Sequence, residues 1–543
     1  MVFARRSTTL LAAIIASCAM VLSLTACTSD NKTVVDGQTT VTSNSAGGVA
    51  VFTPSDGITL NQQVPLNKWA KLVPDLAKAL ADAGFKKGDI DHTTSDSLAK
   101  QSRAIQDFVV DHLSNNTTDD SGIAIAPDNM TLLVAPVVEA DASTRQYGDY
   151  ISQNLSTNDA TDGEATSDGE SSEDDSSKDD SSNTESDSTA SDEQAQAVDR
   201  LVSSLKLAKE SGMHVVLLGN SIEGYKPDAF VKFSDAQTIG KLQAEKMVSK
   251  LKLDKASKDN PKYIEVLLPY TAVDEKGNAN DSTFAQEAFR GIWQVLGFYY
   301  QKGVVESPSG TLDGKSTEND WQAVAYDAAK EGSTAKVLDK RLAKTDGQST
   351  LTRIDGIITM NDYIASEVVK ELDDLGYTGS AADINPQITI SGIVGNITGK
   401  KDLSRDAVPD PIKSPENDNA NDSSSSDDDA DEDTSASDKD RDSQWPLVTG
   451  YGAYVSNIPS IVNGKQWMTG MEDRQTIATD IAQACAKLNK DEALNSMPSI
   501  RNSEVGGVKK IPTISEPLLA VSASNLKSAL IDPGYISLAD AGL

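Results

Sequence analysis

The chain has 543 residues, 38% of them apolar, which is enough for two to four folded lobes. Its formal net charge is −33, and most of this charge lies in two tracts: residues 156–194 carry 14 acids against one lysine, and residues 413–443 carry 12 acids against three bases. The tracts predict disordered insertions, and because phosphate-binding surfaces need clustered Lys and Arg, nucleic acid is not an expected partner.

The N-terminus is typical of an exported lipoprotein. Two arginines precede an apolar run over residues 10–21 that is too short to span a bilayer stably, and "LSLTAC" follows it. We expect a signal peptide over residues 1–26, acylation of Cys27 and a flexible tether over residues 27–48. A transmembrane anchor is the alternative. The predicted location is therefore the extracytoplasmic face of the cell membrane, with the chain held by lipid.

Cysteine usage agrees with this location. Cys18 leaves with the signal peptide and Cys27 takes the lipid, so Cys485 has no disulfide partner within the chain. Apolar residues surround Cys485 at helical spacing, which predicts that it packs in a core.

From residue 49 onward, strand and helix patterns alternate. Strands are expected at 49–53, 130–138, 213–220, 229–235, 262–269, 354–362 and 386–392, and helices at 67–85, 101–113, 198–212, 236–251, 282–303 and 363–377. The strands are apolar throughout and several helices end in glycine. This pattern predicts an α/β fold with two Rossmann-like lobes, each a parallel sheet covered on both faces.

Each acidic tract follows the predicted carboxyl end of a strand. Open parallel sheets bind ligands at that edge, so one interpretation is that the tracts overhang the rim of a ligand cleft. The alternative is that they are solvated expansions without function, since insertions in surface loops cost little stability.

Several phrases in fixed order resemble a known family. The chain resembles type I periplasmic sugar-binding proteins of ABC transporters in its lipoprotein signal, which ends in "LTAC", and in three later stretches: "FSDAQTIGKLQAEKMV", "ITMNDYIASEVVKELDDLGY" and "GKQWMTGM". The segment after Gly506 is most similar to the xylose and multiple-sugar branch. The resemblance implies two lobes joined by a multi-strand hinge, a small solute captured between them, a monomer, an ABC permease as partner, and neither catalysis nor a cofactor.

The resemblance also implies a division of the chain. We expect a first lobe at 49–228 with the insertion 156–194, a second lobe at 229–392, an acidic insertion at 393–444, a return to the first lobe at 445–468, and the second lobe with the C-terminal tail at 469–543.

Sugar sites need flat apolar surface and planar hydrogen-bonding side chains. By resemblance, Trp69 supplies an aromatic face flanked by Asp56 and Lys68, with a core role as the alternative. Asn361 and Asp362 match a pair that points into the cleft, with a helix cap as the alternative.

The other candidate positions include one match to the family pattern and two departures from it. Asp235 matches an acid at a crossing between lobes, again with a capping alternative. Gly219 and Asn220 stand where sugar binders of the family carry Asp-Arg, so a charged, bidentate grip is missing there. The family also carries a Gln-Asp pair after a glycine that ends a strand. In this chain Tyr451 and Gly452 stand at that place if Gly450 is the matching glycine, and residues 393–394 stand there if Gly392 is.

No motif predicts a catalytic residue or a metal site. The three histidines lie far apart, the "GYGAYV" run lacks the third glycine of a dinucleotide loop, and no nucleophile has a plausible base. The chain is therefore predicted to be a binding protein. The alternative function is a ligand-sensing or scaffold lipoprotein that signals to or docks another protein.

Overall fold

The computed structural model describes residues 46–55, 65–115, 125–138, 144–157, 185–273, 280–343, 351–382 and 445–543. Cys27, Asp56, residues 27–45 of the predicted tether and the stretches 158–184 and 383–444 lie outside the described residues. The described residues belong to one compact unit, residues 45–543, which contains two αβα lobes. The predicted fold class, α/β with two Rossmann-like lobes, is confirmed.

The first lobe is built on a seven-stranded sheet in the order β15-β16-β7-β5-β3-β1-β2. All neighbouring strands are parallel except β15 and β16. The strands are β1 (Gly48–Pro54), β2 (Ile90–Ser95), β3 (Met130–Val134), β5 (His214–Leu218), β7 (Ala229–Lys232), β15 (Ile500–Val505) and β16 (Val508–Ser515).

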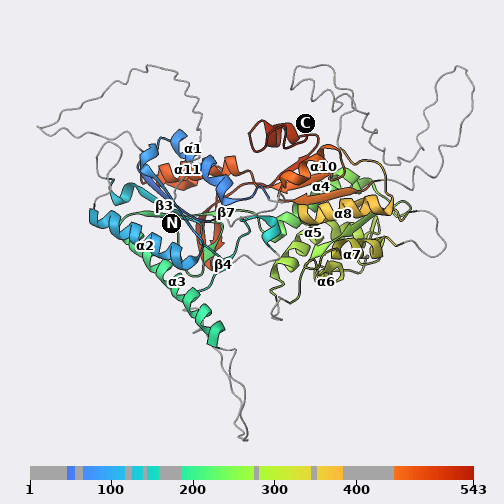
Figure 1. The fold of residues 1–543 in the computed structure, drawn as a ribbon, viewed down its shortest axis with the longest axis horizontal. Helices are drawn as coiled ribbons and strands as arrows, with labels where there is room; N and C mark the ends of the chain where they lie inside the picture. Colours follow the sequence, from blue (N-terminus) through green and yellow to red (C-terminus); the bar gives the residue numbers. More distant parts are fainter. Residues whose placement is uncertain are drawn as a thin grey trace, which may run out of the picture. The chain divides into compact units, whose positions relative to one another are not determined.

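Helices cover both faces of this sheet. Helices α1 (Trp69–Asp82) and α11 (Arg474–Leu488) pack on one face, and α2 (Leu98–Asn115) and α3 (Glu185–Glu210) pack on the other (Figure 1). Alternate residues of each strand enter the two cores, because side chains of a strand point to opposite faces of the sheet in turn. A sheet covered on both faces explains why its central strands are apolar throughout.

Two of these helices show how sequence sets their position. In α1, Trp69, Leu72, Leu76 and Leu80 are buried at helical spacing, as predicted. Helix α3 begins at Glu185, inside the range 156–194 that was predicted to be disordered. From residue 193 onward the helix is rich in Glu, Gln, Ala, Leu and Lys, which favour helix, and it extends back from there into the predicted insertion.

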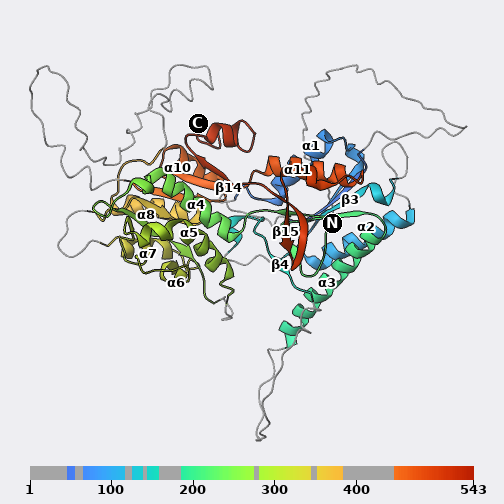
Figure 2. The ribbon, with the colours of Figure 1, turned by 180° about the vertical axis from the view of Figure 1, so that it is seen from behind.

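The second lobe is built on a six-stranded sheet in the order β10-β8-β12-β13-β14-β17, in which only the pair β14 and β17 is antiparallel. Its strands are β8 (Lys262–Val266), β10 (Val305–Glu306), β12 (Gly356–Ile358), β13 (Leu447–Tyr451), β14 (Met468–Met471) and β17 (Leu519–Ser522). Strand β14 is seen most clearly from behind (Figure 2).

Helices also cover both faces of the second sheet. Helices α4 (Ala236–Leu251) and α5 (Thr283–Gln301) pack on one face, and α7 (Ser333–Arg341) and α8 (Asp362–Leu375) on the other. The shorter elements are α6 (Trp321–Val324), α10 (Ile458–Val462), β4 (Asn154–Leu155), β6 (Ser221–Ile222), β9 (Leu268–Pro269) and β11 (Ala325–Tyr326).

Three described segments cross between the lobes. Residues 233–235 join β7 to α4, residues 472–473 join β14 to α11, and residues 516–518 join β16 to β17. Three crossings give a multi-strand connection, as the resemblance implied, but their positions differ from the prediction.

The lobe boundaries therefore need correction. Residues 229–232 form β7 of the first sheet, residues 445–471 remain in the second lobe as β13 and β14, and residues 474–515 return to the first lobe as α11, β15 and β16. The physical reason is strand pairing: β13 is hydrogen-bonded between β12 and β14, so it cannot belong to the first sheet.

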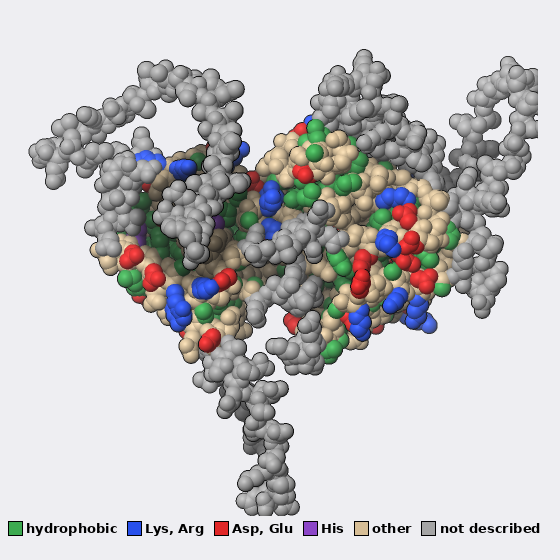
Figure 3. All heavy atoms as spheres, in the orientation of Figure 1, with side chains coloured by type: hydrophobic (Ala, Val, Ile, Leu, Met, Phe, Trp, Pro, Cys, Tyr) green, Lys and Arg blue, Asp and Glu red, His purple; other side chains and the backbone are tan. Residues whose placement is uncertain are grey.

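Charges are mixed over the surface of the lobes. On the face drawn in Figure 3, basic and acidic side chains are interspersed, with no continuous field of one sign on the described part. Among the described residues, none of the helices combines the length and the apolar character that a membrane span requires.

Candidate functional site

The loops at the carboxyl ends of the parallel strands carry the predicted ligand residues of both lobes. They follow β1, β5 and β7 in the first sheet and β12 and β13 in the second. In open α/β sheets this edge is where ligands bind. These loops are therefore the candidate site.

Lys68 and Trp69 stand at the start of α1. Lys68 Nζ forms an ion pair with Asp149 Oδ1 at 2.7 Å, and the Trp69 backbone N–H donates to Asp149 Oδ2 at 3.1 Å. The Trp69 ring is 3% exposed and meets the rings of Tyr150 and Phe233 edge-on, with centroids 5.1 and 5.6 Å away. Trp69 therefore fills the first-lobe core in this structure, and Asp149 holds the start of its helix.

Gly219 and Asn220 follow β5. Gly219 has a φ of +71°, a conformation that side-chain-bearing residues rarely adopt, so the Asp of the family pattern would be strained there. Asn220 is buried, donates from Nδ2 to the Pro136 carbonyl at 2.9 Å and accepts from the Gln153 backbone N–H at 3.0 Å. Its amide thus fastens two first-lobe loops to each other.

Asp235 lies in the first crossing and caps α4. Its Oδ1 accepts from the backbone N–H of Thr238 at 2.7 Å, and Oδ2 pairs with Lys232 at 2.8 Å. Hydrogen bonds from Lys232 and Thr238 lower the pKa of Asp235, although burial, the largest single influence, acts in the opposite direction. The Asp235 carboxylate is therefore bound by neighbouring residues of the chain, Lys232 and Thr238.

Asn361 is fully buried at the carboxyl end of β12. Its Oδ1 caps α8 by accepting from the Ile364 N–H at 2.9 Å, which leaves Nδ2 to donate to Gln146 Oε1 at 3.1 Å. The preceding Met360 has a φ of +68°, uncommon for a non-glycine residue, and this turn sets the direction of Asn361. The predicted cap is present, and the remaining donor of the same side chain is bound to Gln146.

Asp362 is fully buried within the second lobe. Its two oxygens accept from Gln466 Nε2 at 2.7 Å, Tyr454 N–H at 2.9 Å and Thr469 Oγ1 at 2.9 Å. Burial raises the pKa of Asp362 to about 6, although these hydrogen bonds oppose the rise. Asp362 therefore holds the loop after β13 in place and does not face the first lobe.

Tyr451 ends β13 and links two crossings. Its hydroxyl is hydrogen-bonded to the Ser234 hydroxyl in the first crossing and donates to Glu472 Oε1 of the second crossing at 3.5 Å. Glu472 also accepts from the Ser234 backbone N–H at 2.6 Å. Burial raises the pKa of Glu472 to about 7, against the bonds from Ser234. Tyr451 and Glu472 therefore join the hinge segments to each other.

Residues 144–153 form a part of the site that sequence reasoning missed. Tyr147 is 1% exposed and packs in the second-lobe core, with its ring centroid 4.6 Å from that of Phe284 and 6.3 Å from that of Tyr451. The Gln146 carbonyl accepts from the Tyr454 hydroxyl at 2.7 Å. This stretch is polar and has no strand or helix period, and its two tyrosines three residues apart were the only signal.

The described residues do not form a metal or catalytic constellation. No group of three or more His, Cys, Asp or Glu side chains among them could hold a metal ion. Cys485 is fully buried, and burial raises the pKa of its thiol far above the usual value, as suits the core role that we expected. The side chains at the site are amides, aromatic rings and one lysine, which can bind hydroxyl groups and sugar rings.

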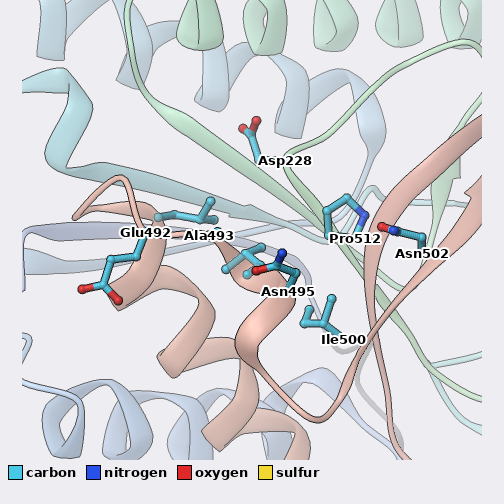
Figure 4. Close-up of a pocket in the computed structure, with 9 residues that line it drawn as sticks. Asp228, Glu492, Ala493, Asn495, Ile500, Asn502 and Pro512 are labelled. Atoms are coloured by element: carbon cyan, nitrogen blue, oxygen red, sulfur yellow. The ribbon is translucent and has the colours of Figure 1, made fainter.

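A separate pocket of about 350 Å³ lies at the other edge of the first sheet, next to the amino ends of β5 and β7 (Figure 4). Asp228 at this pocket accepts from the Val215 N–H at 2.8 Å and pairs with Lys209 at 2.8 Å. Its carboxylate is thus engaged by the fold, and Figure 4 shows it pointing away from Asn495 and Ile500. The pocket does not adjoin the predicted ligand residues.

No protein-family model and no curated protein match the chain. The solved structures that align with it include ABC-transporter solute-binding proteins.

One, from Clostridium phytofermentans with bound β-D-glucose, aligns with a TM-score of 0.43 and 17% identity over 91% of this chain and 99% of its own. A carbohydrate-transporter solute-binding protein from Chloroflexus aurantiacus, in complex with D-glucose, aligns with a TM-score of 0.42 and 18% identity over 92% of this chain and 98% of its own. A periplasmic ribose ABC transporter protein from Conexibacter woesei aligns with a TM-score of 0.42 and 13% identity over 90% of this chain and 96% of its own. The predicted xylose and multiple-sugar branch stays a prediction.

Proposed function

We propose that this chain is an extracytoplasmic solute-binding protein that captures a small polar solute, a sugar, between its two lobes and delivers it to an ABC permease. The observation that carries the proposal is the architecture: two αβα lobes are joined by three crossings, and the ligand-binding edges of both sheets meet. This arrangement suits hinged closure around a ligand that contacts both lobes.

The orientation of Asn361 supports a polar ligand. Its Oδ1 is committed to the cap of α8, so the Nδ2 donor is fixed toward Gln146, in the loop that runs between the lobes. A sugar hydroxyl can accept from this donor, and the Lys68 ammonium on the opposite lobe can bind another. Tyr451 would add an aromatic face for the ring.

The proposal includes anchoring by lipid at Cys27. A chain acylated there would remain near the permease while its lobes open and close. Cys27→Ala should release the chain from washed membranes into the soluble fraction. A Cys27→Ala chain that stays with the membranes would contradict lipid anchoring.

The direct test is a thermal-shift screen of the full chain in detergent against pentoses, hexoses, disaccharides and polyols. One solute should raise the melting temperature by several degrees, because a ligand that binds only the native state stabilises it. Asn361→Asp keeps the cap but removes the donor, so it should abolish the shift. Asp313→Asn, at an exposed turn of the second lobe, is the matched control and should keep it.

A ligand-sensing or scaffold lipoprotein is the second candidate. It is favoured by the residues after β5, where Gly219 carries no side chain and both ends of the Asn220 amide are used inside the first lobe. The charged grip on a hydroxyl pair is therefore missing. A cooperatively melting chain that responds to no solute in the screen would favour this function over transport.

A further inference from the structure

Residues 146–153 contact most of the side chains that were predicted to bind the solute. Asn361 donates to Gln146, and Lys68 forms its ion pair with Asp149. The Trp69 backbone N–H donates to the same carboxylate, and Asn220 accepts from the Gln153 N–H. The predicted ligand residues are thus occupied by the chain itself.

The contacts reproduce those of a ligand held by two lobes. On the second-lobe side, Tyr147 is inserted beside Phe284 and Tyr451, and Gln146 accepts from Asn361 and Tyr454. On the first-lobe side, the ring of Tyr150 stacks on Phe233 with centroids 4.7 Å apart, and its hydroxyl donates to the Lys68 carbonyl at 2.6 Å.

The path of this segment is closely fitted to the first lobe. Gly148 has a φ of +97°, and a Cβ at this position would lie 2.5 Å from the Asn67 carbonyl oxygen. That carbonyl accepts from the Asp149 N–H at 2.8 Å. A glycine is therefore required where the segment turns from the second lobe toward α1.

Two hydroxyls of the segment, those of Tyr147 and Ser152, are buried and make no hydrogen bond with the described residues. The Asn361 side chain, which is bonded to Gln146 and Ile364, still lies close enough to the Tyr147 hydroxyl to lower its pKa against the effect of burial. Native structures rarely leave a buried polar group unpaired, since its lost hydration is not replaced. An unpaired hydroxyl at this place weakens the seated segment relative to a ligand whose hydroxyls are all bonded.

We propose that residues 146–153 are a built-in occupant of the interlobe cleft, which a solute must displace before it binds. This inference rests on the proposed function, because it concerns regulation of the same site. The occupant holds the lobes together without solute through Tyr147 and Gln146 on one side and Asp149 and Tyr150 on the other. It lowers the apparent affinity in proportion to the fraction of molecules whose cleft is free.

The test compares Tyr147→Ala with Tyr147→Phe in the full chain held in detergent. Hydrogen–deuterium exchange of peptides covering 284–296 and 361–368 reports whether the segment is seated, and calorimetry with D-xylose and D-glucose reports binding. Tyr147→Ala should raise exchange in both peptides and tighten binding at least tenfold. Tyr147→Phe keeps the ring and removes the unpaired hydroxyl, so it should not raise exchange in either peptide and should not tighten binding.

A matched control separates displacement from general loosening. Tyr225 is a buried first-lobe tyrosine whose hydroxyl also lacks a partner among the described residues. Tyr225→Ala should lower the melting temperature but leave exchange at 284–296 unchanged. If Tyr147→Ala does not melt cooperatively, Asp149→Asn, which removes the ion pair with Lys68, carries the same test with a smaller gain in affinity.

The outcomes distinguish this inference from the proposed function. Unchanged exchange in Tyr147→Ala, or affinity equal to that of the wild-type chain, would overturn the occupant. Raised exchange without binding of either sugar would uphold the occupant, and the thermal-shift panel repeated on this variant would then decide whether sugar capture fails.

Discussion

Truncation of Trp69 separates a core role from a ligand role for this residue. The ring is 3% exposed, and it packs edge-on against Tyr150 and Phe233. Removing a buried tryptophan loses its transfer free energy and leaves a cavity, so Trp69→Ala should lower the free energy of unfolding by about 3–5 kcal/mol. Its backbone contact with Asp149 survives the change.

The measurement is urea unfolding of the full chain, followed by far-ultraviolet circular dichroism. Because two-lobed proteins can unfold in stages, the midpoint of the first transition should be compared with that of the wild-type chain. Val110→Ala, at an exposed position on α2 of the same lobe, is the control and should shift the midpoint little.

The reasoning would be refuted by the opposite pattern. If Trp69→Ala costs less than about 1 kcal/mol and yet abolishes solute binding, then the ring faces the ligand and not the core. The first-lobe interior would then have to be packed differently from the structure described above.

Three further predictions concern buried polar groups. Burial raises the pKa values of Asp362 to about 6 and of Glu472 to about 7, so the folded chain holds protons that the unfolded chain releases. The free energy of unfolding should therefore fall as pH rises from about 4 to 7, by on the order of 3 kcal/mol per group, and urea midpoints across this range test it; a rise would contradict it. Asn220→Ala leaves the Pro136 carbonyl and the Gln153 N–H unpaired and should cost about 1–3 kcal/mol in the same assay; an unchanged midpoint would contradict it. With Cys18 and Cys27 replaced by serine, the Cys485 thiol should react with Ellman's reagent only after unfolding; prompt reaction of that native chain would show that Cys485 is not in the core.

Local sequence patterns predicted the individual elements well. The apolar spacing from Trp69 to Leu80 gave α1, and α4 spans the same residues, 236–251, as its pattern predicted. Periodicity does not state which sheet a strand joins, however. The division at 445–468 was wrong because the sequence of this stretch does not state which sheet it joins. Only the pairing of β13 with β12, and of β14 with β13, places both strands in the second lobe.

The site was predictable in part. The capping alternatives for Asn361 and Asp235 agree with the hydrogen bonds that both residues make, because Asn and Asp before a helix have a local signature. The environment of Asp362 was not visible, since its partners Gln466 and Thr469 lie about a hundred positions along the chain. The occupying segment around Tyr147 was missed because an irregular polar loop carries no period.

The central claim is that the two lobes close around a solute. It is tested most directly by electron–electron distance measurement between spin labels at Lys71→Cys on α1 and Lys370→Cys on α8, in the full chain carrying Tyr147→Ala. Without solute the account predicts a long, broad distance distribution, and saturating sugar should convert it to a short, narrow one. A distribution that no sugar changes would contradict capture between the lobes.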